Sequence, residues 1–353
     1  MPNQQDVYME KFKVEYKGTS TKMILKIALF IALLTTGCTD NSNVVVVYTT
    51  VDQIFSEPIL KDFENETGIT VKAVYDTEET KSTGVLNRLI AEKANPQCDV
   101  FWSGDPARTI VLKNQGITAP YHAQVANDID PVFKDPEYHW TGFSARARVL
   151  IYNKNLLKPN DVPQSIYDLT KEQYRGKVAI ANPLFGTTTF HMAALFTAMG
   201  DKKAKKFLTD LKNNDVVIAT SNGDVKKRVL QGEITCGLTD TDDANEALKE
   251  GTHVDFVLLG QQGIGCLIIP NLVNLINNSS HSENGKKLMD YLLSKETEVK
   301  LAKSCAQMPL HKGVEIHKNM QSLDHIVPMK IDYGTTAQKL EEIQNYLKEW
   351  VEN

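Results

Sequence analysis

The chain alternates short runs of β-branched residues with stretches whose apolar residues recur at helical spacing. Val44–Tyr48 is a continuous apolar run, which is typical of a strand buried on both faces of a parallel sheet. Pro58–Gly68 follows and predicts an amphipathic helix that ends at Gly68. This strand–helix alternation predicts an α/β fold with mostly parallel sheets.

The same alternation continues along most of the chain. Further strands are expected at Ile69–Tyr75, Asp99–Trp102, Val149–Tyr152, Lys177–Ala181, Val216–Thr220 and Cys236–Thr239. Further helices are expected at Gly84–Ala94, His191–Ala198, Lys202–Asn213, Val225–Gly232 and Ala244–Glu250. About 315 residues remain once the N-terminal segments described next are set aside, and this length fits two lobes or domains.

The N-terminal region has the layout of an export signal. Met23–Cys38 contains an early Lys, a short apolar run and small residues before a Cys, as in a bacterial lipoprotein signal peptide. We expect Cys38 to be lipidated and residues 39–43 to form a tether. The alternative is a buried helix that ends just before Cys38. Residues 1–22 are polar and charged, so we expect them to be an extension outside the native chain.

Net charge and cysteine content narrow the function classes. The formal charge of −5 argues against nucleic acid as a partner, because phosphate binding needs clustered Lys and Arg. Outside the N-terminal signal no segment is apolar enough to cross a membrane, so the lipid would be the only anchor. The cysteines other than Cys38 match no metal-binding spacing, and both disulfides and buried free thiols stay open. They are Cys98, Cys236, Cys266 and Cys305.

Eight segments together resemble a known family. They are Val46–Thr50, Phe63–Val71, Cys98–Trp102, Gly116–Tyr121, Phe143–Asn153, Asn182–Thr189, Gly232–Glu233 and Leu238–Ala244. In this order and spacing the chain resembles the periplasmic ferric-iron-type (family 1) extracellular solute-binding proteins of ABC transporters, here in lipoprotein form. Each motif is weak alone, but the resemblance extends from the first strand to the C-terminal helix.

The resemblance implies a two-lobed, type II periplasmic-binding-protein-like fold with a ligand cleft at the hinge. It places residues 44–142 plus 264–325 in the first lobe and residues 143–263 plus 326–353 in the second. It also implies a monomer in the periplasm or at the cell surface that delivers a small-molecule or metal ligand to an ABC-transporter permease. No obligatory cofactor and no enzymatic activity are expected.

Three loops have the character of anion sites. In α/β sheets, ligands bind outside the carboxyl ends of strands, where helices begin. Gly186, Thr187, Thr188 and Thr189 open one such helix and offer N–H and hydroxyl donors, although plain N-capping is the alternative. The resemblance implies a phosphate or carbonate there. The other loops contain Lys81, Ser82 and Thr83, and Ser221 and Asn222.

For these two loops the alternatives are a solvated loop and a simple turn. For Asn222 the resemblance implies a hydrogen bond to the bound anion. Arg146 and Arg148 are expected at the hinge side of the cleft or facing solvent.

A cluster of carboxylates departs from the ferric-binding pattern. Asp240, Asp242 and Asp243 follow a strand, where ferric binders carry two neighbouring tyrosines near the last two positions. Asp52 stands in place of the family's His, and Asp105 is the carboxylate nearest to the expected Glu. Adjacent carboxylates repel each other unless a cation or donors hold them. The alternative is that the cluster caps the following helix.

The donor set leaves the ligand open. Asp52, Asp105 and Asp242 are the expected metal ligands, and oxygen donors suit Fe³⁺ with a synergistic anion, or Ca²⁺. The same acidic set beside an anion-binding helix start also suits an aminophosphonate or a sugar phosphate. From other classes, a secreted hydrolase would use paired carboxylates, but its usual motifs are missing. A surface adhesion lipoprotein has only the tether in its favour.

Overall fold

The computed structural model describes residues 43–76, 83–316 and 322–353. Residues 43–353 form one compact unit. The expected signal peptide, the lipidation site Cys38, and the loop residues Lys81 and Ser82 lie outside the described residues. In the described part, no helix is both long and apolar enough to cross a membrane.

The strands form two sheets that share one long strand, β5. The first sheet contains β1 (Val44–Thr49), β2 (Thr70–Tyr75), β3 (Val100–Ser103), β4 (Thr118–Ala119), β10 (Ile268–Ile276) and part of β5 (Thr141–Asn153). The second contains the rest of β5 with β6 (Val178–Ala181), β7 (Val217–Ala219), β8 (Cys236–Asp240) and β9 (Val254–Val257). The strand order along the main path is β2-β1-β3-β10-β5-β8-β6-β7.

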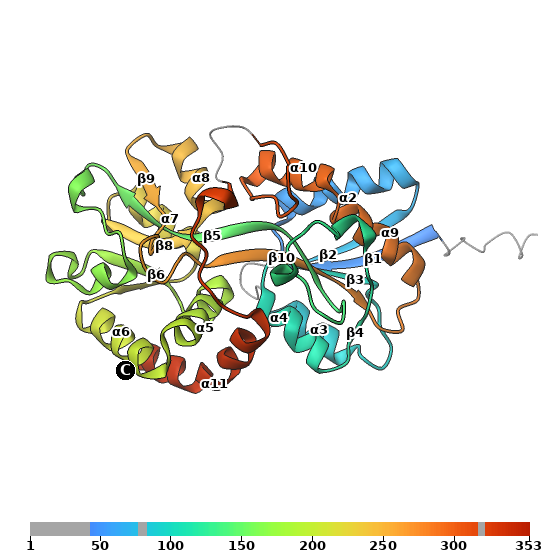
Figure 1. Cartoon of the computed structure of the whole chain (residues 1–353), viewed down its shortest axis with the longest axis horizontal. Helices are drawn as coiled ribbons and strands as arrows, with labels where there is room; N and C mark the ends of the chain where they lie inside the picture. The colour runs from blue at the N-terminus through green and yellow to red at the C-terminus, as the bar shows by residue number, and fades with distance from the viewer. Residues whose placement is uncertain (1–42, 77–82, 317–321) are drawn as a thin grey trace, which may run out of the picture. The chain divides into compact units, whose positions relative to one another are not determined.

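The helices fall into two groups, one around each sheet (Figure 1). The first group is α2 (Gln53–Thr67), α3 (Thr83–Ala91), α4 (Pro106–Asn114), α9 (Ser282–Leu292) and α10 (Lys295–Cys305). The second is α5 (Gly186–Met199), α6 (Asp201–Asn213), α7 (Asn222–Leu230) and α8 (Thr241–Glu250). The C-terminal helix α11 (Tyr333–Glu352) packs against α5 and also against α4.

Every strand and helix named in the sequence analysis is present, most of them with small shifts at the ends. The largest shift is in β5, which begins at Thr141 rather than at Val149. The helix α2 begins at Gln53 rather than at Pro58. Proline lacks the N–H that would bond to the carbonyl of Ile54, so the sequence suggested a helix start there. Ile54 is 75% exposed at this end of the helix, where water can solvate its backbone. The left-handed conformation of Gly68 ends the helix as expected.

The expected parallel pairing is confirmed in the outer parts of both sheets. β1 pairs parallel with β2 and β3, and β6 pairs parallel with β7 and β8. In contrast, β5 and β10 pair antiparallel with their neighbours. The sequence analysis had not identified β10, because Pro270 interrupts the segment and marks a register shift against β5.

Two large apolar clusters lie on either side of the central strands. One contains Phe63, Trp102 and Phe143, and the other contains Phe190, Phe196 and the C-terminal Trp350. The sequence did not decide between disulfides and free thiols. In the structure the four cysteines are buried and form no disulfide: Cys98, Cys236, Cys266 and Cys305. The lobe boundaries expected from the sequence remain a prediction.

Candidate ligand-binding cleft

A cleft of about 510 Å³ lies where the carboxyl ends of strands from both sheets come together. Thr50 and Asp52 follow β1, and Gly104 and Asp105 follow β3. From the second sheet, the residues after β6, β7 and β8 line the other wall. Binding sites of α/β proteins form at this edge of the sheet, because the loops there open into helix N-termini.

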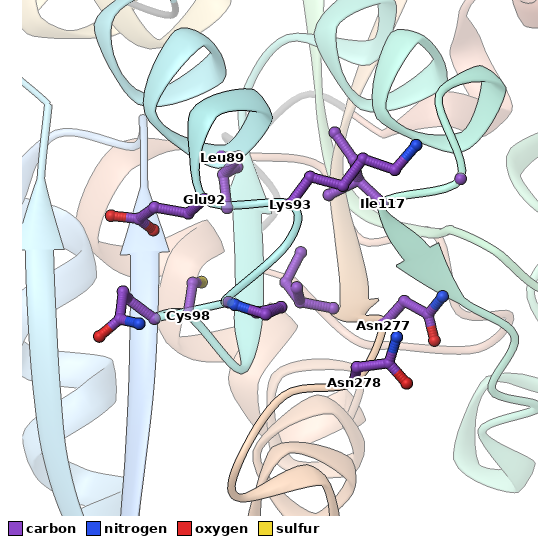
Figure 2. Close-up of a pocket in the computed structure, with 11 residues that line it drawn as sticks. Leu89, Glu92, Lys93, Cys98, Ile117, Asn277 and Asn278 are labelled. Carbon is purple, nitrogen blue, oxygen red and sulfur yellow. The ribbon is translucent and has the colours of Figure 1, made fainter.

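A second, smaller cavity of about 80 Å³ lies at the opposite edge of the first sheet (Figure 2). Cys98 precedes β3, and Asn277 and Asn278 follow β10 in its wall. Glu92, which also lines this cavity, is already bonded to Arg88 and to the Tyr48 hydroxyl. The carboxylate of Glu92 is therefore already used inside the fold, and the larger cleft is the better candidate for a ligand.

Most residues predicted for the site line this cleft. They are Asp52, Asp105, Gly186, Thr187, Thr188, Ser221, Asn222, Asp240, Asp242 and Asp243. Thr189 is buried in the first turn of α5 but does not line the cleft. Thr83 begins α3, and Lys81 and Ser82 lie outside the described residues. The role of each residue in ligand binding remains a prediction.

A buried ion pair organises the second-sheet wall. Arg148 on β5 donates to Asp240 at the end of β8, with 2.8 Å between Nη1 and Oδ1, and both side chains are 2% exposed. The two residues are direct neighbours across the antiparallel strands. Thr187 and Asn222 donate to the other oxygen of Asp240, at 2.8 and 3.1 Å. Arg148 also donates to the Asn222 side-chain carbonyl at 3.1 Å.

This network changes how the expected anion site is interpreted. The Thr187 hydroxyl, the Asn222 amide and the Arg148 guanidinium all hold a carboxylate that belongs to the protein itself. Burial would raise the pKa of Asp240, but Arg148 and Arg146 bring it below its ordinary value. The Asp240 carboxylate therefore occupies the place where a bound anion was expected, and the Arg148 side chain does not face solvent.

The capping alternatives can be checked at each helix start. Asp105 does cap α4, accepting from the Ala107 N–H at 3.0 Å, and Ser221 caps α7. Asp240 stands at the N-cap position of α8, but its side chain makes no capping hydrogen bond. Phe185, before Gly186, gives α5 no side-chain cap either. The start of α5 therefore opens on the cleft without a capping side chain.

The remaining carboxylates are held less completely. Asp242 lies 3.5 Å from Arg146, measured from Oδ2 to Nη1, and Asp243 accepts from the Thr239 hydroxyl at 2.9 Å. Burial raises the pKa of Asp242, and burial together with Asp242 and Asp240 raises the pKa of Asp243 to about 7. Burial is the larger cause of both pKa shifts, and the neighbouring aspartates add to it.

Arg146 lies among these carboxylates. Its Nη2 donates to the Gly104 carbonyl at 2.6 Å, and its Nη1 lies 3.9 Å from Asp240. Burial opposes its charge, yet the carboxylates of Asp242 and Asp240 raise the pKa of Arg146 above its ordinary value. In the described part of the chain, six carboxylates and two cationic side chains line the cleft.

The three aspartates expected to bind a metal do not gather in this structure. Among the described residues, no three His, Cys, Asp or Glu side chains lie close enough together to hold a metal ion. Asp52 and Asp105 come from the first sheet and Asp242 from α8 in the second. A metal bound by all three would need these walls to approach each other.

Sequence reasoning missed several residues of the cleft. Thr50, Asn182, Phe185, Lys226 and Glu246 also line it. Two of them could have been found from helical spacing, since Lys226 is four residues after Asn222 and Glu246 four after Asp242. The others depend on how the loops fold.

A family model described as bacterial extracellular solute-binding protein matches residues 59–328, which is most of the chain. The chain belongs to this family. Family members are transport components without enzymatic activity, so the hydrolase alternative is not supported and the expectation of a non-enzyme is confirmed.

Three comparisons illustrate the range of this solute-binding family. Iron uptake protein A1 of Synechocystis sp. is 27% identical over 272 residues, covering 74% of each chain. A putative 2-aminoethylphosphonate-binding periplasmic protein of Salmonella typhi is 28% identical over 298 residues, covering 82% of this chain and 80% of its own. Iron-bound HitA from Pseudomonas aeruginosa superimposes with a TM-score of 0.78 at 22% identity, covering 86% of this chain and 99% of that one. The two-lobed binding-protein fold is thereby confirmed.

Proposed function

We propose that this solute-binding protein captures iron(III) in the cleft and delivers it to an ABC-transporter permease. The observation that carries the proposal is the excess of carboxylates over cationic side chains at the cleft, where six carboxylates and two cationic side chains of the described residues form the lining. Arg148 and Arg108 pair with Asp240 and Asp105 from behind the lining, so two carboxylates remain in excess. Buried carboxylates repel each other unless a cation holds them, and oxygen donors suit a hard cation. Relatives and solved structures named for iron support the same ligand.

Two features of the chain shape how iron would be held. Among the described residues, no tyrosine or histidine lines the cleft, so the ligands would be carboxylates from Asp52, Asp105 and Asp242. The start of α5, which has no capping side chain, is where a synergistic anion would complete the coordination. This arrangement requires the two walls to close around the ion.

The family supports a location outside the cytoplasm. We propose that the protein is located in the periplasm or at the cell surface. Lipidation at Cys38 would anchor the protein through its N-terminus, with a monomeric binding unit facing the permease. Detection of a diacylated N-terminal peptide by mass spectrometry would test the anchor.

The cargo is tested by native mass spectrometry with elemental analysis of the purified chain, followed by titration with ferric citrate. One iron per chain is expected, and Asp242→Asn should weaken binding at least about tenfold, because a unit charge near the ion is removed. A matched control is Asp255→Asn, which changes an aspartate in β9 that does not line the cleft. Wild-type protein that fails to bind iron would contradict the proposal.

A second candidate is a zwitterion such as an aminophosphonate. The uncapped start of α5 favours it, because backbone N–H groups there suit a phosphonate while the aspartates would hold an ammonium. The network around Asp240 weighs against it, since that internal carboxylate already uses the Thr187 and Asn222 donors. A bound mass containing phosphorus and no metal would favour this candidate over iron.

A further inference from the structure

We propose that Arg146 is an internal cation of the cleft, which competes with the cargo for the carboxylates and limits the charge that the cleft accepts. The inference rests on the proposed function, because it assumes that the cargo is cationic. It assigns to Arg146 a role in selectivity.

The first step is the difference between two arginines on the same strand. The Arg148 side chain is 2% exposed and donates to Asp240 at 2.8 Å, with further bonds to Asn222 and Thr187. The Arg146 side chain is 15% exposed, and its ion pairs with Asp242 and Asp240 are long, at 3.5 and 3.9 Å. Arg148 is therefore part of the wall, whereas Arg146 stands in the cleft as a loosely paired charge.

The second step is the position of the Arg146 guanidinium. Its Nη2 donates to the Gly104 carbonyl of the first wall, while its Nη1 faces Asp242 of the second. A Cβ added at Gly104 would lie 3.2 Å from this Nη2, so glycine provides the room for the approach. The guanidinium thus spans the gap between the two groups of carboxylates that would hold a cationic cargo.

The third step is electrostatic. The carboxylates that act on Arg146 are Asp242, Asp240, Asp52 and Asp243. Two of them, Asp242 and Asp52, are also candidate ligands of a cationic cargo. A bound cation would therefore lie within a few ångströms of a fixed positive charge. Coulomb repulsion scales with the charge of the cargo, so at equal distance a trivalent ion is repelled three times as strongly as a monovalent one. Arg146 should consequently lower affinity most for highly charged free ions.

The test uses terbium(III) and calcium as hard-cation probes of different charge, with affinity measured by terbium luminescence and by calorimetry on the full chain. Arg146→Met keeps much of the side chain's length and removes its charge. We expect this variant to bind terbium(III) at least about tenfold more tightly than wild type, with a smaller gain for calcium.

Two further variants separate charge from structure. Arg175→Met removes a cationic side chain that is 45% exposed and does not line the cleft, so it should leave the terbium-to-calcium ratio near the wild-type value. Arg146→Lys keeps the charge and should bind both probes much like wild type. Unfolding curves check that each variant is folded.

The outcomes distinguish the two proposals. Unchanged or weaker terbium(III) binding by folded Arg146→Met would overturn the competition, as would an equal change in the terbium-to-calcium ratio from Arg175→Met. Loss of selectivity in Arg146→Lys would show that the bond to Gly104 matters rather than the charge, and would also overturn it. If wild type and all variants bind neither probe nor ferric citrate, the proposed function itself fails.

Discussion

The two walls of the cleft are built differently. The second-sheet wall is a buried network in which Arg148, Asp240, Thr187 and Asn222 satisfy one another. On the first-sheet wall, by contrast, Asp105 caps a helix and lies 3.5 Å from Arg108, and Asp52 is exposed at the start of another helix. The comparison suggests that the second wall is a rigid platform, whereas the charges of the first wall can be changed with little effect on the fold.

The largest expected effect comes from breaking the platform. Arg148→Met removes the ion partner of a buried carboxylate, so we expect the free energy of unfolding to fall by about 3–5 kcal/mol. Urea unfolding monitored by circular dichroism would measure the loss. The double variant Arg148→Met with Asp240→Leu should recover much of it, because no buried charge is then left unpaired.

A surface pair provides the control for this experiment. Arg175 forms ion pairs with Glu172 and Asp215, but its side chain is 45% exposed. Arg175→Met should therefore change the free energy of unfolding by less than about 1 kcal/mol. Equal effects at Arg148 and Arg175 would contradict the distinction between a buried platform and an ordinary surface.

The next effect is smaller and depends on pH. His191 is buried behind the second wall, and burial together with Arg148 lowers its pKa to about 3. Between that value and the ordinary pKa of about 6.5, the unfolded chain binds a proton at His191 that the folded chain does not. The stability contributed by neutral His191 is therefore complete above about pH 6.5 and is lost as the pH falls toward 3.

His191→Gln removes this dependence. Between pH 6.5 and pH 4.5 we expect the wild type to lose about 2–3 kcal/mol of unfolding free energy more than the variant does. Denaturant unfolding at several pH values measures the difference between the two proteins. If the unfolding free energies of the two proteins fell equally with pH, the prediction would be wrong. His191 would then be protonated in the folded protein, or the Arg148–Asp240 network would open at a higher pH than that at which His191 titrates.

The sequence predicted the parts of this molecule that depend on local pattern. Val44–Tyr48 and Lys177–Ala181 were recognisable as strands because β-branched and apolar residues follow one another there. Many of the cleft residues were predictable because they lie in the loops and helix starts that follow such strands. The pairing of Arg148 with Asp240 was not, since it depends on the register of two strands far apart in the chain.

Sequence also could not separate two roles that one residue type performs equally well. An aspartate before a helix can cap it or bind a ligand, and both positions look the same in the sequence. The structure divides them: Asp105 caps its helix, whereas Asp240 at an equivalent position bonds to Arg148 and Thr187 instead. Whether Asp105 also binds the ligand can be tested by substitution.

The smallest expected effect answers that question with two substitutions at Asp105. Asparagine keeps an oxygen that can accept from the Ala107 N–H, so Asp105→Asn should preserve stability within about 0.5 kcal/mol, whereas Asp105→Ala should lose about 1 kcal/mol with the cap. Burial raises the pKa of Asp105, which makes a neutral replacement easier to accommodate. Both variants lose the charge, so if Asp105 binds the cargo they should weaken ferric citrate binding by the same factor. Urea unfolding would then show a loss of stability in Asp105→Ala only, while calorimetry would show the same loss of affinity in both variants. If only Asp105→Ala bound ferric citrate more weakly, Asp105 would act only as a cap.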